Sequence, residues 1–183
     1  MHKALLKTYY FWYVFSMTRT SNLKKLAEIA ALNLGVVTLA QAQEAGVPSV
    51  EVHKLAKRGS LERVGTGVYR AGFFPRNEFS DAHESVLAVN ADAWLAGESV
   101  LSLLNLGNFN PRKRLVKTTK RFQRKPPSAT LVKVVNTPQE TAVYGGVRCE
   151  PVFLAMQSVG AYTPRNEFES SVGRALALDY LTE

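Results

Sequence analysis

The stretch 49–58, SVEVHKLAKR, places side chains that form hydrogen bonds and ion pairs along one short segment. Hydroxyl, carboxylate, imidazole and ammonium groups form hydrogen bonds with the edges of DNA bases, and lysine and arginine neutralise phosphates. The side chains expected at base edges are Ser49, Glu51, His53 and Lys54. The side chains expected at phosphates, some of them in flanking segments, are Thr38, Lys57, Arg58, Arg63, Thr66 and Arg70.

A second positive segment, 112–133, carries nine lysine and arginine residues and no carboxylate. It favours a second phosphate-contacting surface, which would add affinity without sequence readout. The alternatives are a flexible basic loop that aids solubility, and contact with an acidic protein or with a partner's RNA. The residues expected in this second basic surface are Arg112, Lys113, Arg114, Lys117, Lys120, Arg121, Arg124 and Lys125.

The charge of the whole chain is uneven. The 183 residues carry a formal net charge of +8, which points to a polyanionic partner. Residues 1–80 are net positive by 6 and residues 111–133 by 9, whereas 81–110 are net negative by 4 and 134–183 by 3. Two basic blocks are therefore separated by an acidic one.

The residue types needed for catalysis or for a structural metal are scarce. The single cysteine, Cys149, excludes an internal disulfide framework, and too few cysteines and histidines are present for a structural zinc site. The sequence has no CxxC, no HExxH and no phosphate-binding GxxxxGK[ST] loop. His83 falls on a predicted helix and is expected to be exposed, and Cys149 is expected to be buried and inert. We therefore expect no enzyme, no cofactor and no metal.

Three helices are predicted ahead of a hairpin. Residues 22–34 have apolar positions at i, i+3, i+4 and i+7, the pattern of an amphipathic helix. Thr38 is expected to cap a short helix that ends at Gly46, and Ser49 is expected to cap the helix that ends at Gly59.

A β-hairpin follows, with strands at 61–64 and 68–71 joined by a glycine-containing turn. Helix, helix, tight turn, helix and hairpin is the order of a winged helix-turn-helix, whose third helix enters the major groove. The hairpin would then be the wing. The small core between the second and third helices is expected to contain Leu39, Ala42, Val50 and Leu55.

Residues 37–70 resemble the N-terminal winged-helix domain of AbiEi-type antitoxins, from type IV toxin–antitoxin systems. The shared pattern is the turn AGVP at 45–48, a helix ending in LxKRG at 55–59, LxRV at 61–64 and GVY at 67–69. The resemblance implies a regulator that binds double-stranded DNA of its own promoter, with inverted repeats. It also implies, as a possible partner, a nucleotidyltransferase-like toxin that is neutralised directly or indirectly.

The second half is predicted to be mixed. Helices are expected at 80–91, 98–105, 151–160 and 166–180, and strands at 112–121, 129–136 and 142–148. The last helix is expected to turn Phe168, Val172, Ala175, Leu176 and Leu178 toward a core. The segment 94–111 loosely resembles the one that opens the C-terminal domain in the AbiEi family. The sequence PRNEF occurs twice, at 75–79 and 164–168, and in both places it is expected to precede a helix.

The expected fold class is α+β, with an N-terminal winged helix-turn-helix at 21–74 and a smaller mixed α/β C-terminal, antitoxin-like domain at 80–183. Residues 1–20 form an N-terminal extension, for which three alternatives remain: a segment docked on the body, sequence before a true start at Met17, or a partner-binding tail. Its apolar run at 9–15 is far shorter than the roughly 20 residues that span a bilayer. We expect a cytoplasmic protein without a membrane partner.

The expected function is that of a sequence-specific DNA-binding transcriptional repressor and antitoxin that autoregulates a toxin–antitoxin operon. One alternative is a winged-helix module that binds a protein partner. Another is an RNA-associated accessory protein that uses residues 112–133. Neither alternative includes sequence-specific DNA binding.

Overall fold

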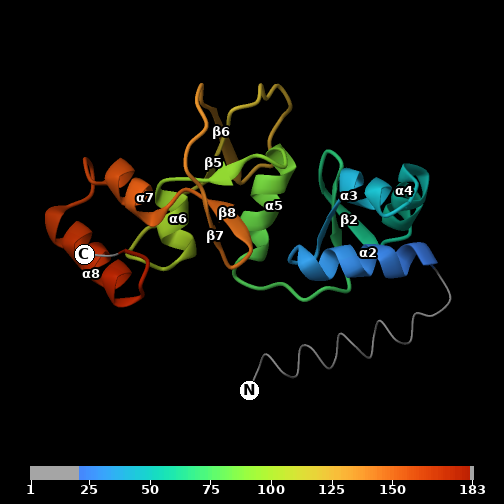
Figure 1. The fold of residues 1–183 in the computed structure, drawn as a ribbon, viewed down its shortest axis with the longest axis horizontal. Helices are drawn as coiled ribbons and strands as arrows, with labels where there is room; N and C mark the ends of the chain where they lie inside the picture. Colours follow the sequence, from blue (N-terminus) through green and yellow to red (C-terminus); the bar gives the residue numbers. More distant parts are fainter. Residues whose placement is uncertain (1–20, 182–183) are drawn as a thin grey trace, which may run out of the picture. The chain divides into compact units, whose positions relative to one another are not determined.

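The computed structural model describes residues 21–181, which form two compact units divided between Arg76 and Asn77 (Figure 1). Both units combine helices with β-sheet, so the predicted α+β class is confirmed. The second unit, Asn77–Glu183, is the longer of the two, and the expectation of a smaller second domain was wrong. The N-terminal extension 1–20, with its aromatic run, lies outside the described residues.

The first unit has the element order of a winged helix-turn-helix. From residue 21 onward, this unit has three helices and three strands in the order α2 (Ser21–Leu32), β1 (Val36–Thr38), α3 (Leu39–Glu44), α4 (Ser49–Lys57), β2 (Leu61–Gly65) and β3 (Val68–Ala71). The strands form one antiparallel sheet in the order β1-β3-β2. The predicted hairpin is present, and the Val36-Val37 segment adds a third strand to it.

Apolar side chains from all three helices and the sheet meet in one core. Leu26 of α2, Ala42 of α3, Val52 of α4 and Tyr69 of β3 are each almost fully buried. The prediction that Val50 belongs to this core was wrong, because Val50 is 59% exposed. Two positions along α4 correspond to about 200° around a helix, so only one of the two valines can face the core.

The start of α3 is held by a capping box. Thr38 Oγ1 accepts a hydrogen bond from the Gln41 backbone, and the Gln41 side chain accepts from the Thr38 backbone. The predicted Thr38 cap is therefore confirmed. The predicted Ser49 cap was wrong, because Pro48 is the N-cap of α4 and Ser49 is the first helical residue. Proline lacks the side-chain acceptor that a capping hydroxyl supplies, and its fixed φ suits the entry to a helix.

The second unit is a five-stranded mixed sheet with helices. Its elements are α5 (Ser80–Val89), β4 (Trp94–Leu95), α6 (Glu98–Leu103), β5 (Arg114–Thr118), β6 (Thr130–Val134), β7 (Ala142–Tyr144), β8 (Val147–Cys149), α7 (Val152–Val159) and α8 (Arg165–Ala177). The strand order is β6-β5-β4-β8-β7, with parallel pairs at β5–β6 and β4–β8. Figure 1 shows α5 beside this sheet and α7 next to α6.

Two strand predictions for this unit need correction. The expected single strand at 142–148 is a tight hairpin, because the chain reverses at Gly145 and Gly146, which both have positive φ. The central strand β4 was not predicted at all. It is only two residues long, and an alternating pattern of two residues carries no periodic signal.

Two side-chain predictions and one helix boundary in the second unit also need correction. Leu178, expected to face a core, lies past the end of α8 and is 51% exposed. His83, expected to be exposed, is buried with its neighbour Glu84, because almost all of α5 is enclosed. The two PRNEF segments also differ, since the second is already inside α8 from Arg165 onward.

Candidate nucleic-acid interface

Helix α4 presents a continuous exposed face. Val50, His53, Lys54 and Lys57 are all exposed, and their spacing of i, i+3, i+4 and i+7 puts them on one side of the helix. Val52 lies on the opposite side and is fully buried. Two of the four expected base-reading residues, His53 and Lys54, therefore lie on this face together with Val50, a residue that the sequence analysis assigned to the core.

The other two expected base-reading residues are placed differently. Ser49 begins the helix and is half-buried. Glu51 is also half-buried, and its carboxylate Oε1 accepts a hydrogen bond from Lys54 Nζ at 2.8 Å. This exposed pair holds the lysine side chain beside the first turn of α4, where a carboxylate also interacts favourably with the helix dipole.

His53 is bound to the wing sheet. Its Nδ1 lies 3.1 Å from the hydroxyl of Tyr69 in β3, and the two rings meet edge to face with centroids 6.0 Å apart. Tyr69 is 1% exposed, whereas His53 is exposed. A buried residue of the sheet thus fixes the imidazole on the outer face of the helix.

The wing tip is joined to the beginning of α3. The Gly67 carbonyl accepts a hydrogen bond from the Leu39 backbone at 2.8 Å, and Gly67 has a φ of +72°. Thr66 is exposed at this turn, and Arg63 Nε donates to the Gly65 carbonyl at 3.3 Å. Two of the expected phosphate contacts therefore lie close together on the wing.

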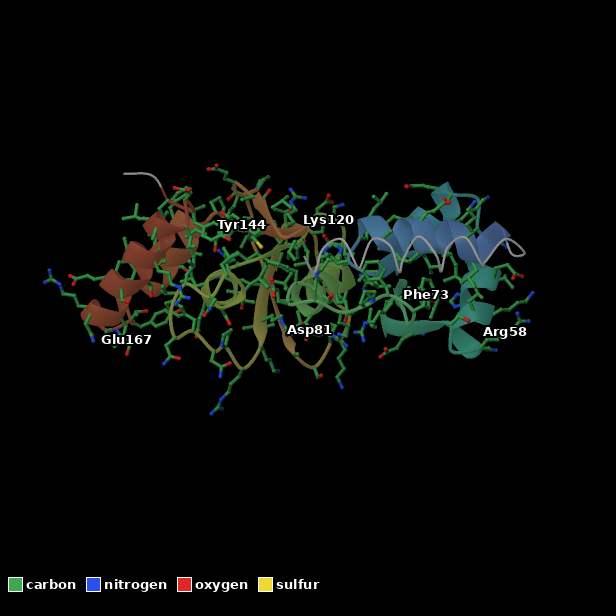
Figure 2. The ribbon with its side chains drawn as sticks, turned by 90° about the horizontal axis from the view of Figure 1, so that it is seen from below. Arg58, Phe73, Asp81, Lys120, Tyr144 and Glu167 are labelled. Atoms are coloured by element: carbon green, nitrogen blue, oxygen red, sulfur yellow. The ribbon has the colours of Figure 1, made fainter. Side chains whose placement is uncertain are left out.

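Two further expected phosphate contacts are occupied inside the unit. Arg70 donates to Glu62 Oε2 at 3.1 Å, and its side chain is only 15% exposed. The Thr38 hydroxyl is engaged with Gln41, to which it also donates at 3.0 Å. Lys57 and Arg58, by contrast, are exposed at the end of α4, and Figure 2 labels Arg58 there.

A comparison with known protein families finds a match in this unit. A family model described as "Transcriptional regulator, AbiEi antitoxin" matches residues 24–72, which reach from α2 past the end of β3. The winged unit matches the AbiEi antitoxin family. The match confirms the resemblance seen in the motifs at 45–48 and 61–64, and the description of the matched family names a transcriptional regulator. A comparison with curated proteins finds no relative that matches the chain.

The second basic surface lies outside the AbiEi-type unit, and several of its cations are neutralised by nearby groups. Lys117 Nζ forms an ion pair with Glu150 Oε1 at 2.6 Å, and both side chains are nearly buried. Arg114 pairs with Asp81 at 3.2 Å. Part of the positive charge of the segment is therefore used to neutralise carboxylates within the second unit.

The crossover from β5 to β6 contains two more engaged cations. Lys120, labelled in Figure 2, pairs with Asp92 and lowers the pKa of that carboxyl. Arg124 donates to the Val89 carbonyl at 3.0 Å and lies over the Phe122 ring.

The remaining members of the expected second basic surface are accessible. Arg112, Lys113, Arg121 and Lys125 are all exposed. Within residues 21–181 we find no ion pair to Arg112, Lys113 or Lys125. The part of the segment that is open to a polyanion is therefore smaller than its nine charges indicate.

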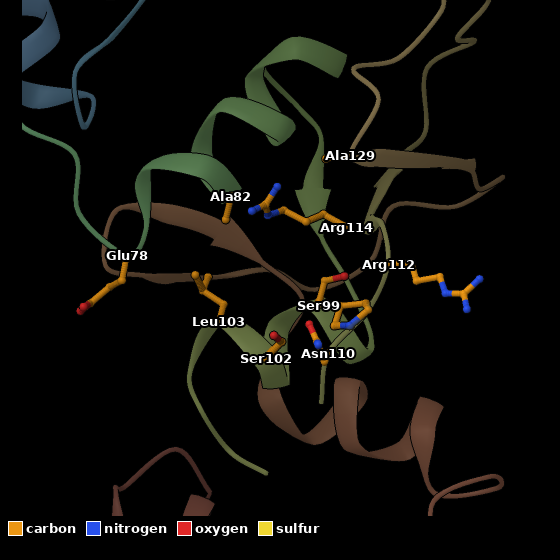
Figure 3. A pocket seen from close by; sticks show the side chains of 10 residues that line it. Glu78, Ala82, Ser99, Ser102, Leu103, Asn110, Arg112, Arg114 and Ala129 are labelled. Carbon is orange, nitrogen blue, oxygen red and sulfur yellow. The ribbon is translucent and has the colours of Figure 1, made fainter. Parts of the chain in front are cut away.

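A pocket of about 370 Å³ lies within the second unit (Figure 3). Its polar lining includes Ser99, Ser102, Asn110 and Arg114. The Ser99 hydroxyl accepts a hydrogen bond from the Leu115 backbone, and Arg114 is paired with Asp81, so both contribute to the local structure. The pocket is lined by no histidine and no cysteine.

The described residues contain no group of three or more His, Cys, Asp or Glu side chains that could hold a metal ion. Cys149 is fully buried, and burial raises the pKa of its thiol to about 12, which keeps it protonated at neutral pH. Among the helices of residues 21–181, none is long and apolar enough to cross a membrane.

Proposed function

We propose that this protein is a sequence-specific DNA-binding repressor and antitoxin that binds its own promoter and so autoregulates a toxin–antitoxin operon. The observation that carries the proposal is the exposed face of α4, which combines hydrogen-bonding and cationic side chains on the helix that a winged helix-turn-helix inserts into the major groove. The AbiEi family match supports the general role.

The first turns of α4 would lie at base edges. Ser49, His53 and Lys54 then supply hydrogen bonds to bases, and Glu51 positions Lys54 through their ion pair. Lys57 follows one turn later, where the helix leaves the groove and meets the phosphate backbone. This arrangement separates sequence readout at the start of the helix from phosphate binding at its end.

The wing would add phosphate contacts beside the same groove. Arg63 and Thr66 are exposed on the hairpin, and Arg58 follows directly after α4. Arg70 and Thr38 contribute less in this proposal, because their polar groups are already engaged. Operator DNA with inverted repeats would place one AbiEi-type unit on each half-site.

The second unit would serve the antitoxin role. The AbiEi family description names antitoxins, so a nucleotidyltransferase-like toxin is the partner we propose, neutralised directly or indirectly. We assign no catalytic step to either unit and place the protein in the cytoplasm.

A second candidate function follows from the accessible part of the second basic surface. Arg112, Lys113 and Lys125 are exposed cations near the β5–β6 crossover. They favour an additional contact with DNA or RNA backbone, which would raise affinity without base readout. Competition between RNA and duplex DNA, with and without alanine at these three positions, separates the two ligands.

A gel-shift series with the DNA upstream of the gene tests the main proposal. Lys54→Ala should reduce affinity for upstream DNA more than for unrelated duplex, and Arg58→Ala should reduce affinity for both equally. Arg174→Ala, which changes an exposed arginine of α8 outside both proposed basic surfaces, is the matched control. If neither Lys54→Ala nor Arg58→Ala alters affinity, this assignment of α4 is wrong.

A further inference from the structure

The centre of the exposed face of α4 is an apolar side chain. With about 100° between successive residues, Ser49, His53, Lys57, Val50 and Lys54 follow one another around the helix in that order, and Val50 lies near the middle. Its side chain is 59% exposed. Val52 fills the core from this helix and Leu55 and Ala56 pack against it, so packing gives no reason for a further apolar residue at position 50.

Val50 also lies at the end of the helix that would be closest to bases. It is the second residue of α4, after Pro48 and Ser49. The N-terminal residues of a recognition helix contact base edges in the major groove, whereas later residues approach the backbone. An apolar group at this position therefore faces the groove floor.

One apolar group is available on that floor. The 5-methyl group of thymine projects into the major groove, and small apolar side chains contact it. We propose that Val50 is a specificity-determining residue of this protein and that it contacts a thymine methyl group in the recognised half-site. The proposal rests on the proposed function, because it requires α4 to enter the major groove.

The neighbours of Val50 place this contact within a mixed readout. His53 and Lys54 lie one turn further along the same face and offer polar groups to adjacent bases. The contact between Val50 and thymine would therefore have hydrogen-bonding side chains on either side of it. Such a face fits a half-site in which a thymine lies next to bases that present hydrogen-bond acceptors.

The test compares thymine with deoxyuridine, which lacks only the 5-methyl group. The preferred duplex is first selected from a randomised library with the full chain, and each thymine is then replaced in turn by deoxyuridine. At one thymine of the half-site, the replacement should weaken binding of the wild-type protein by about four-fold, the effect of burying one methyl group. Val50→Ser, which replaces the apolar side chain with a polar one, should bind the thymine and deoxyuridine duplexes equally.

The control is Leu32→Ala, which removes a side chain that is 87% exposed at the end of α2 and leaves α4 intact. This variant should retain the preference for thymine over deoxyuridine. The inference is overturned if the wild-type protein selects a sequence but no thymine replacement alters affinity, or if Val50→Ser keeps the preference. If no sequence is selected at all, the proposed function fails, and this inference fails with it.

Discussion

The hydroxyl of Tyr69 lies 3.1 Å from Nδ1 of His53 and joins the buried centre of the wing sheet to the exposed face of α4. In the tautomer of a neutral imidazole that carries its proton on Nε2, the Tyr69 hydroxyl donates to Nδ1. In that tautomer His53 presents its Nε2–H to solvent as a hydrogen-bond donor.

This relationship predicts that Tyr69→Phe lowers discrimination at the base that His53 contacts. The loss of one orienting hydrogen bond should reduce the preference by about five-fold, because the imidazole is no longer fixed in one orientation and tautomer. The salt dependence of binding should not change, since no phosphate contact is removed. Competition titrations with single-base variants of the preferred duplex measure the effect.

A double-mutant cycle checks that Tyr69 acts through His53. His53→Ala should cause a similar loss of discrimination, and the combined variant should lose no more than either single variant. Additive losses would show that the two residues act independently and would contradict this role for Tyr69.

Arg58 and Arg70 are predicted to differ, although both are arginines of the winged unit. Arg58→Ala should weaken binding to all duplexes equally and reduce the magnitude of the log–log salt slope by about 0.9, the value for one phosphate contact. Arg70→Ala should change the slope less, because Glu62 already engages the Arg70 guanidinium and little of this side chain is exposed. Titrations over a range of salt concentrations measure both slopes, and equal slope changes would contradict the assignment.

Lys117 is predicted to act on stability. Lys117→Met should lower the free energy of unfolding by about 3–5 kcal/mol, because it leaves the Glu150 carboxylate buried without its partner. Adding Glu150→Gln should recover part of the loss. Urea unfolding of the full chain measures these changes.

The matched control for Lys117 is Lys125→Met, which changes an exposed lysine of the same basic segment. It should alter the free energy of unfolding by less than about 0.5 kcal/mol. Equal stability changes in Lys117→Met and Lys125→Met would show that Lys117 belongs to an open basic surface after all.

His83 is predicted to make stability depend on pH. Burial lowers the pKa of this imidazole below its ordinary value of 6.5, against the opposing effects of the Gly146 backbone and the Glu84 carboxylate. The unfolded chain therefore takes up a proton at a higher pH than the folded chain. The contribution of neutral His83 to the free energy of unfolding is fully present above about pH 6.5. It is lost as the pH falls toward the folded-state pKa.

Urea unfolding at several pH values between 5 and 8 measures this effect. His83→Leu should lose less stability on acidification than the wild-type chain, whereas Val143→Ala, which changes an exposed and non-titrating side chain of the same unit, should behave like the wild type. An unchanged pH dependence in His83→Leu would contradict the role of the buried imidazole.

Much of the winged unit could be predicted from the sequence because its signals are local. The apolar spacing of 22–34, the Thr38 capping box and the glycines that end α3 and α4 each specify structure within a few residues. Which of Val50 and Val52 faces the core could not be predicted in the same way. Both fit an apolar helix position, and only the packing of the core that contains Tyr69 and Leu26 decides which of them is buried.

The second unit depends more on contacts between distant segments. β4 is a strand only because β5 and β8 lie on either side of it, and its two residues have no pattern of their own. The partners of the basic segment are equally distant in sequence, as with Glu150 for Lys117. The run of lysines and arginines therefore predicted a nucleic-acid-binding surface, whereas the fold uses several of these side chains in ion pairs within the second unit.

The measurement that tests the central claim most directly is a fluorescence-anisotropy titration of the full chain with two duplexes, one from upstream of the gene and one scrambled from the same bases. It is carried out at about 50 mM and about 200 mM salt, a range over which phosphate contacts weaken strongly. We predict that both affinities fall with salt and that the preference for the upstream duplex remains at the higher concentration. Equal affinity for the two duplexes, or binding that does not depend on salt, would contradict sequence-specific DNA binding by α4.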